Sequence, residues 1–434
     1  MSAPCSRKHL SAEGLLSEAR RCFGKIPEPP GCDIALVDHL MAGLALFGLK
    51  YPSLLQFDQD GREGTTPANL KALYGIERTP SDTRFRERLD AVDPRQLRPL
   101  YKALLGVLQR GKGLEDFAYL DGHYLLSLDG TGYFSSKKVH CAQCGEKHHR
   151  DGTITYYHQM LGAVLVHPDF KEVFPLAPEP ILKQDGAKKN DCERNAAKRL
   201  LEDLRREHPH LKLIVIEDAL ASNAPHIRQL QAQDLRFILG AKQSDHTFLF
   251  EWVDQTPGTA ESALTDEDGV HHRFRYLNGA PLNETNFELE VNFLEYWETA
   301  PSGKVQHFSW VTDIALHPGN LMTIMRGART RWKIENETFN TLKNQGYHFE
   351  HNFGHGDQNL STVLMHLMML AFLIDQIQQR CCRLFQAALT VAQTKIRLWR
   401  KLRSRFDLCF IDSWEALYRS IFQPPRIVLT NDTS

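Results

Sequence analysis

The chain has almost no net charge and no long apolar run. Its 434 residues carry 52 Lys and Arg against 53 Asp and Glu, which gives a formal charge of −1 at pH 7. This balance excludes a globally basic nucleic-acid binder, so contact with phosphates must come from local basic patches. The longest apolar stretch, Leu360 to Ile374, contains His366 and is closed by Asp375, and it is short for a membrane span. We therefore expect a buried helix there and no membrane partner.

The chain also lacks the marks of a secreted protein. No apolar segment follows Met1 to Pro4, so we expect no signal peptide. The nine cysteines are odd in number and unevenly spread, which is typical of a reducing cytoplasm rather than of a disulfide framework. The length allows a large core and roughly two to four domains. These features predict a cytoplasmic protein.

Three acidic residues in separate segments are the most informative feature that the sequence does contain. Asp129 closes the apolar run 125–128, and Asp218 follows the run 213–217. Each run predicts a buried strand with an Asp at its carboxyl end, where open α/β sheets place their chemistry. Glu335 lies in the segment 331–343, which has helical spacing. Two strand-end Asp residues and one helical Glu can converge on Mg²⁺, and a pair of such ions serves phosphoryl transfer.

Each acid taken alone has a simpler interpretation. A single Asp after a strand is commonly a turn or helix-cap residue. Glu335 alone would be a surface ion-pair partner of Arg331. The three acids together, with Arg331 and Lys343 at helical spacing around Glu335, favour the catalytic interpretation.

With these residues, the chain from about 125 to 356 resembles the bacterial insertion-sequence transposases that have a ribonuclease H-like core and an acidic (DDE) triad. Arg331, Glu335 and Lys343 look like the family's Tyr-x2-Arg-x3-Glu-x6-Lys signature. Ala328 stands where the signature has Tyr, and seven residues rather than six separate Glu335 from Lys343. Glu337 is therefore an alternative third acid. At about 100° per residue, Arg331 and Glu335 share a helix face while Glu337 points nearly opposite, which favours Glu335.

The resemblance implies a DNA transposase of α+β fold class: a ribonuclease H-like catalytic core interrupted by an antiparallel β-insertion, with helical regions at both ends. It implies that Asp129, Asp218 and Glu335 bind two Mg²⁺ or Mn²⁺ ions, and that Arg331 and Lys343 lie on phosphates near the scissile bond. The implied partners are double-stranded DNA, as element ends and as target, and a second copy of the chain when DNA is bound. Two alternatives remain open: a metal-dependent nuclease of the same fold without strand transfer, and a retired transposase that only binds DNA.

Five parts follow from the patterning along the chain. We expect a leader with a Pro-rich linker (1–31) and a helical region (32–115) that either recognises DNA ends or merely supports the core. The core would comprise 116–245 and 315–375. Strict alternation at 287–293 predicts an antiparallel β-insertion over 246–314. A helical basic region (376–434) would complete the chain.

A Cys-x2-Cys pair, Cys141 and Cys144, is followed by His148 and His149. Two thiols and two imidazoles can hold one tetrahedral Zn²⁺, and these four residues are our candidate ligands. The usual second pair a dozen or more residues away is missing, so reduced thiols in a polar loop are the alternative.

Two further features have two interpretations each. The segment 395–405 interleaves six basic residues with apolar ones. It predicts either a helix on DNA phosphates or a solvated helix face. Its candidate phosphate contacts are Arg397, Arg400, Lys401 and Arg403. Trp310, at the exit of the predicted insertion, is by the resemblance a candidate to stack on an extruded base, and otherwise packs in the core.

Overall fold

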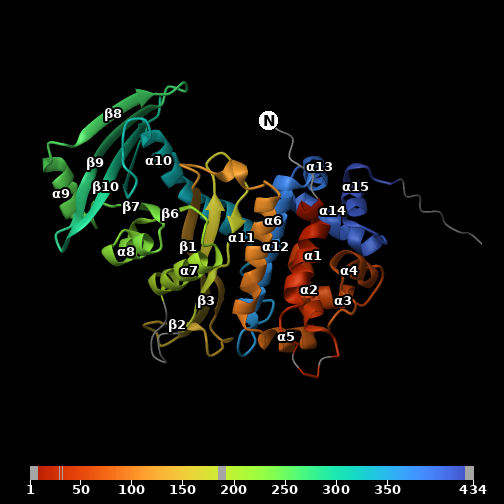
Figure 1. Cartoon of the computed structure of the whole chain (residues 1–434). Coiled ribbons are helices and arrows are strands. Elements are labelled where there is room, and N and C mark those ends of the chain that lie inside the picture. Colours follow the sequence, from red (N-terminus) through yellow and green to blue (C-terminus); the bar gives the residue numbers. More distant parts are fainter. Residues whose placement is uncertain (1–7, 29, 32, 184–191, 426–434) are drawn as a thin grey trace, which may run out of the picture.

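The computed structural model describes residues 8–28, 30–31, 33–183 and 192–425. Within them the chain is an α+β protein built on one mixed sheet. Figure 1 shows a helical region on one side, the central strands in the middle and an antiparallel arm on the other side. Residues 1–7 of the predicted leader and 426–434 of the predicted C-terminal region lie outside the described residues.

The helical region combines the two ends of the chain. Its N-terminal helices are α1 (Ala12–Phe23), α2 (Leu36–Gly48), α3 (Leu54–Asp60), α4 (Thr66–Tyr74), α5 (Asp82–Asp90) and α6 (Arg98–Arg110), with short 3₁₀ turns η1 (Lys8–Leu10), η2 (Pro94–Leu97) and η3 (Glu115–Phe117). Its C-terminal helices are α12 (Leu360–Cys381), α13 (Arg383–Ala392), α14 (Lys395–Leu408) and α15 (Trp414–Phe422).

Helix α12 is the centre of this region. Among the described residues it is the one helix long and apolar enough to cross a membrane by length and composition, yet 94% of its apolar window is buried inside the protein. It packs against α2, α5, α6 and α13. The buried helix expected from the run Leu360 to Ile374 is therefore confirmed.

The predicted loose leader is wrong over residues 12–23, which form helix α1. Ser11 caps the helix by accepting a hydrogen bond from the Gly14 N–H. Leu15, Ala19 and Phe23 lie one helical turn apart and are fully buried, and α1 packs on α6 and α2. This apolar stripe, rather than the Pro-rich stretch that follows, decides the structure of the segment.

The central strands are β1 (Tyr124–Ser136), β2 (Gly145–His148), β3 (Ile154–Val166), β4 (Phe174–Pro175), β5 (Glu179–Ile181), β6 (Leu213–Glu217) and β7 (Arg236–Gly240). The sheet order is β2-β3-β1-β6-β7 in this part, with β4 and β5 also paired to β3. Strands β1, β6 and β7 are parallel, and β3 is antiparallel to β1. Helices α7 (Glu193–Glu207) and α8 (Ala224–Ala232) provide the connections to β6 and β7.

The predicted insertion contains helix α9 (Thr247–Gln255) and strands β8 (Ala260–Thr265), β9 (His271–Asn283), β10 (Asn286–Thr299) and β11 (Val305–Thr312). Neighbouring strands here are antiparallel, as the alternation predicts. Strand β11 also pairs with β7, so the arm continues the central sheet instead of forming a separate layer. Helix α9, which packs on β9, was not expected.

The chain returns from the arm through α10 (Leu321–Arg329), the 3₁₀ turn η5 (Thr330–Trp332), η6 (Ile334–Phe339) and α11 (Asn340–Asn344). The stretch η6 is a π-helix, in which each turn holds about one residue more than in an α-helix. The regular α-helix that we expected over 331–343 is therefore interrupted in the middle.

Candidate functional site

The pairing of β1 with β6 brings the first two acids together. The last registered pair of these parallel strands is Ser127 opposite Ile216. Two residues further on lie Asp129 and Asp218. Asp218 directly follows β6, as expected, but the prediction that Asp129 closes its strand is wrong, because β1 continues to Ser136 and stays paired with β3. Since β1 and β6 run in the same direction, the two carboxylates lie side by side where the parallel pairing ends.

The third acid arrives on η6, which lies against β1 and β3. The Ser127 hydroxyl donates to the Arg331 carbonyl over 3.1 Å, which ties β1 to η5. On β3, Gly162 lies opposite Asp129 in the register, and a Cβ there would come within 3.1 Å of the Phe339 ring. The absence of a side chain at Gly162 is what allows this close approach of the helix to the sheet.

The electrostatics show that Asp218 and Glu335 both act on Asp129. Burial raises the pKa of Asp129, and the carboxylates of Asp218 and Glu335 raise it further. The Arg331 guanidinium, whose Nη1 lies 3.5 Å from Asp129 Oδ2, and the Gly130 N–H, 2.9 Å from Oδ1, oppose this rise in pKa. The edge of the sheet therefore carries clustered negative charge facing one Arg.

Glu337, the alternative third acid, acts on a different part of the molecule. Burial lowers the pKa of Lys333 and of Lys395, and the Glu337 carboxylate opposes both shifts. Glu335, by contrast, contributes to the pKa of Asp129. The two glutamates thus face different neighbours, and this favours Glu335 as the partner of the two Asp residues.

Asp218 also acts as a cap residue, the simpler role considered for a single Asp after a strand. Its Oδ1 accepts from the Leu220 N–H over 2.9 Å and caps the short 3₁₀ turn η4 (Ala219–Ala221). The neighbouring Glu217 binds His226 over 2.6 Å. Burial alone would lower the pKa of His226, but the Glu217 carboxylate overcomes this and raises it. Capping fixes the direction of the exposed Asp218 carboxylate and is compatible with a role in binding.

A cleft of about 300 Å³ opens beside Asp129 and Asp218, between β1, β6, α7 and α8. Asp129 and Asp218 line it together with Glu193, the first residue of α7. A side chain at Gly130 would collide with the Glu193 carboxylate. Burial raises the pKa of Glu193, and Asp129, Asp218 and Glu217 raise it further. Sequence reasoning missed Glu193, because no apolar run precedes it.

Arg331 and Lys343 lie on either side of Glu335 along the chain. Arg331 is half-buried, with its guanidinium carbon 4.9 Å from the centre of the exposed Trp332 ring. The Lys343 ammonium pairs with Glu350 over 2.9 Å. Because the π-helical stretch η6 takes up one additional residue, Lys343 returns to the helix face of Glu335 despite the seven-residue separation.

The basic segment 395–405 forms helix α14, and the structure does not bring it to the acids. Figure 1 shows α14 among the C-terminal helices, away from β6 and α8. Arg397, Arg400 and Lys401 are exposed, and Arg397 donates to the Gln393 side chain over 2.8 Å. Arg403 is half-buried and donates to the Lys50 carbonyl over 3.0 Å, which is a structural contact.

Trp310 lies in β11 opposite Gly240 of β7 and is only 6% exposed. Its ring stacks on Phe308 at 5.8 Å between centroids. A buried ring has no free face for a base. The expected stacking role is therefore contradicted in this conformation, and core packing, the alternative, describes the residue.

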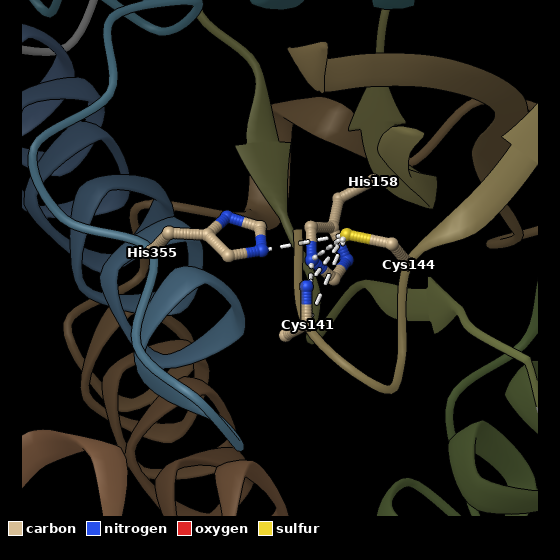
Figure 2. Close-up of side chains that lie close together, drawn as sticks. All are labelled: Cys141, Cys144, His158 and His355. Atoms are coloured by element: carbon tan, nitrogen blue, oxygen red, sulfur yellow. Dashed lines mark hydrogen bonds between the residues drawn. The ribbon is translucent and has the colours of Figure 1, made fainter. Parts of the chain in front are cut away.

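The two cysteines form a compact cluster with two histidines, but not with those predicted (Figure 2). The ligand set is Cys141, Cys144, His158 and His355. The predicted ligands His148 and His149 point elsewhere, His148 to Glu146 at 3.2 Å and His149 to Thr155 at 2.8 Å. Strand β2 begins directly after Cys144, and an extended strand carries His148 about 13 Å away in four residues.

Within this Cys/His cluster the ligand atoms all lie within 4.8 Å of one another. Cys144, His158 and His355 are buried, and Cys141 is half-buried. The Cys144 thiol and, next to it, the His158 imidazole hold the pKa of the Cys141 thiol well below its ordinary value, against the effect of burial. A thiol that loses its proton easily is a good metal ligand.

Comparisons with known proteins add little to this geometry. No protein-family model and no curated protein matches the chain. A similar solved structure is the cryo-EM structure of the piggyBac transposase synaptic complex with hairpin DNA, at 9% sequence identity and a TM-score of 0.40. The alignment covers 95% of this chain and 80% of that one. At that TM-score the likeness supports no conclusion about function, which must come from the site itself.

Proposed function

We propose that this chain is a DNA transposase that cleaves the ends of an insertion element and joins them to target DNA by metal-dependent phosphoryl transfer. The observation that carries the proposal is the convergence of Asp129, inside β1, and Asp218, directly after the adjacent parallel strand β6, with Glu335 from η6. Asp218 stands at the carboxyl end of a parallel strand, which is where α/β sheets place their chemistry.

The proposal includes a ribonuclease H-like core, formed by residues 116–245 and 315–375. The mixed sheet with its parallel strands β1, β6 and β7 supports it, as does the helix that returns across the sheet after the β-insertion. The residues 246–314 would be the insertion, and 32–115 and 376–434 the flanking helical regions.

The residues at the sheet edge fit divalent metal ions. The donors are carboxylate oxygens, the ligand type that Mg²⁺ and Mn²⁺ prefer. Burial is the main reason for the raised pKa of Asp129, and repulsion from Asp218 and Glu335 adds to it; a bound cation would relieve that repulsion. Asp129, Asp218 and Glu335 would hold two such ions, and Glu193 lies close enough to Gly130 to adjust the charge of the site. When bound, the ions supply activation of the attacking hydroxyl and stabilisation of the leaving oxygen.

The basic residues of the site would position DNA without reacting. Arg331 Nη1 lies 3.5 Å from Asp129 Oδ2. The guanidinium group is planar, so it can bind a phosphate with two parallel hydrogen bonds. Lys343 would leave its ion pair with Glu350 and bind a phosphate instead. The free-energy cost of breaking that pair is moderate, because the pair is partly exposed to solvent. Together they fix the scissile phosphate next to the carboxylates.

The partners in this proposal are double-stranded DNA, at the element ends and at the target, and a second copy of the chain when DNA is bound. The protein would act in the cytoplasm without a membrane partner. The exposed side chains of α14 are a separate candidate for non-specific phosphate contact.

A two-stage assay tests the proposal. Duplexes taken from the DNA immediately flanking the gene are incubated with purified protein and Mg²⁺ or Mn²⁺, and nicks are mapped. A second reaction supplies a pre-cut end with a target plasmid and measures joining. Asp129→Asn protein is the matched control for both stages.

Each outcome decides between functions. Cleavage at a discrete end together with joining supports a transposase. Cleavage without joining identifies a nuclease of the same fold, and binding without cleavage identifies a DNA-binding protein that has lost the activity. Wild-type activity in the Asp129→Asn protein would overturn the assignment of the site.

A further inference from the structure

The Cys/His cluster lies outside the carboxylate site and draws on three parts of the chain. Cys141 and Cys144 come from the loop between β1 and β2, and His158 comes from β3. His355 comes from the loop that joins α11 to α12, 211 residues after Cys144. Figure 2 shows the four side chains pointing toward a common centre.

Four of the six separations between the ligand atoms fit a tetrahedron around one zinc ion, and the other two lie within 4.8 Å. With Zn–S bonds of about 2.3 Å and Zn–N bonds of about 2.0–2.1 Å, the edges should be about 3.8 Å between sulfurs and about 3.5 Å between sulfur and nitrogen. The Cys141 and Cys144 sulfurs are 3.8 Å apart. His158 Nε2 lies 3.5 Å from Cys141 Sγ and 3.4 Å from Cys144 Sγ, and His355 Nε2 lies 3.4 Å from Cys144 Sγ.

The chemistry of the four ligands also favours zinc. Two thiolates and two neutral imidazoles balance the charge of a divalent ion, so the filled site is neutral and can be buried. Sulfur and imidazole ligands in a tetrahedral arrangement are typical of zinc rather than of Mg²⁺ or Ca²⁺. Four protein ligands leave no open coordination position, which is the mark of a structural site.

The two histidines present the same nitrogen to the thiols. His158 and His355 are 1% and 7% exposed, and their Nδ1 atoms are buried without a hydrogen-bond partner among the described residues. Nε2 is therefore the nitrogen through which each ring makes its polar contact. In both rings Nε2 points at the sulfurs. Phe134 closes the site from one side, 4.2 Å from the His355 ring centre.

His355 lies on the segment that follows the third acid. Residues 345–359 lead from α11, at the end of the Glu335 helix, to α12. Near the far end of the segment, Gln143 of the Cys-x2-Cys loop donates to the Asn359 side chain over 3.2 Å. The Asp90 carboxylate accepts hydrogen bonds from the backbone N–H groups of residues 357–360. The segment is thus fixed at its end. Its Phe349 ring also contacts Tyr133 of β1, 6.1 Å between centroids, and the cluster adds a second contact with the sheet through His355.

We propose that Cys141, Cys144, His158 and His355 bind one structural Zn²⁺, which fastens the segment 345–359 to the β1–β3 part of the sheet. Two thiol protons are released when the ion binds, and no electrons are transferred. The site differs from the ligand set expected from sequence, and it does not depend on the chain acting on DNA.

The first experiment measures metal content. Full-length protein purified without chelators should contain one zinc per chain, and the His355→Asn variant should lose it. The matched control is His351→Asn, an exposed histidine on the same segment outside the cluster. The double variant His148→Asn/His149→Asn should keep its zinc. Absence of zinc from the wild-type protein, or its loss from this double variant with retention in His355→Asn, overturns the proposal.

A second experiment needs no variant and so does not depend on whether a substituted chain folds. Wild-type protein is treated with a zinc chelator, and limited proteolysis is followed by mass spectrometry before and after zinc is returned. Chelation should speed cleavage within 345–359 severalfold, and zinc should reverse this. Unchanged cleavage after complete removal of zinc would show that the ion does not hold the segment. A Cys141–Cys144 disulfide in place of zinc would equally contradict the site.

Discussion

The carboxylate site and the Cys/His cluster are built from the same parts of the chain but differ in every chemical respect. Each combines residues from the first strands of the sheet with a residue that follows the β-insertion. The carboxylates are oxygen donors beside an open cleft, and Asp218 and Glu335 are exposed. The cluster has nitrogen and sulfur donors, is closed on all sides by protein ligands, and is largely buried.

In the two roles that we propose, burial distinguishes a catalytic site from a structural one. An open set of oxygen donors leaves coordination positions for substrate, at the cost of repulsion between unshielded charges. A closed set of thiolates and imidazoles leaves none, and its ion contributes to folding instead. The predictions below test whether the two sites divide their roles in this way.

The largest effect is expected for the three acids. Asp129→Asn, Asp218→Asn and Glu335→Gln should each lower the rate of metal-dependent cleavage about a thousandfold, because several kcal/mol of transition-state stabilisation depend on the ions they hold. The melting temperature should not fall, since each change removes a repulsive charge. Nicking rates and thermal melting of the same samples check both parts.

Glu337→Gln is the control for this series, because its charge acts on Lys333 and Lys395 and not on Asp129. It should keep nearly full activity. If Glu337→Gln is inactive while Glu335→Gln is active, the assignment of the third acid is reversed.

The Cys/His cluster should show the opposite pattern. Cys144→Ser should lose zinc and lower the melting temperature by about 5 °C or more, because metal binding contributes free energy to the folded state only. Zinc added to the variant should not restore stability, whereas zinc added to chelated wild-type protein should. A Cys192→Ser variant, altered at an exposed cysteine outside the cluster, serves as the comparison. Equal melting temperatures of Cys144→Ser and Cys192→Ser would show that the Cys/His cluster does not stabilise the fold, in contradiction to the proposed structural role.

Glu193 tests where the carboxylate site ends. We expect Glu193→Gln to lower the cleavage rate about tenfold, equivalent to about 1.4 kcal/mol, by changing the charge around Asp129 without removing one of the three acids. Glu202→Gln, an exposed change on the same helix, should have no effect. The dependence of rate on Mg²⁺ concentration distinguishes the two variants. A thousandfold loss in Glu193→Gln would instead add this residue to the acids that hold the ions.

The smallest effect is expected for the exposed basic residues of α14, which belong neither to the lining of the carboxylate cleft nor to the Cys/His cluster. Replacing Arg397, Arg400 and Lys401 by Gln should flatten the slope of log affinity against log salt by about 0.9 for each phosphate that the helix no longer neutralises. Cleavage at saturating DNA should be unchanged. Arg403→Gln should lower stability instead, because this side chain binds the Lys50 carbonyl. A wild-type salt slope in the triple variant would show that α14 is a solvated helix.

The parts of the structure that could be predicted from sequence are those that depend on local pattern. The apolar runs before Asp129 and Asp218 predict strands, and parallel pairing of two strands is enough to place both acids at one edge. The alternation at 287–293 predicts the antiparallel arm for the same reason. Helical spacing favours Glu335 over Glu337 as the third acid, and this choice stays a prediction, because the helix there is partly π.

The parts that could not be predicted depend on contacts between distant segments. His158 lies inside an apolar strand and is indistinguishable in sequence from a core residue, and His355 lies 211 residues beyond Cys144. His148 and His149 follow the Cys-x2-Cys pair at a spacing that is typical of zinc ligands. His148 is the last residue of β2 and His149 comes directly after it, and this strand leads away from the thiols. Glu193 opens a helix after a segment without a pattern. In each case the tertiary fold, not the local sequence, selects the partner.

The π-helical stretch η6 determines how this helix can accommodate the loss of one residue. A turn of this kind is what an α-helix becomes when one residue is added and the residues on both sides keep their places. Deleting Asn336, an exposed residue within it, should therefore shorten the turn to an ordinary α-helical one while Glu335 and Lys343 stay in phase. The π-helical turn thus accommodates one residue locally, and Glu335 within it and Lys343 after it stay on the same side of the helix.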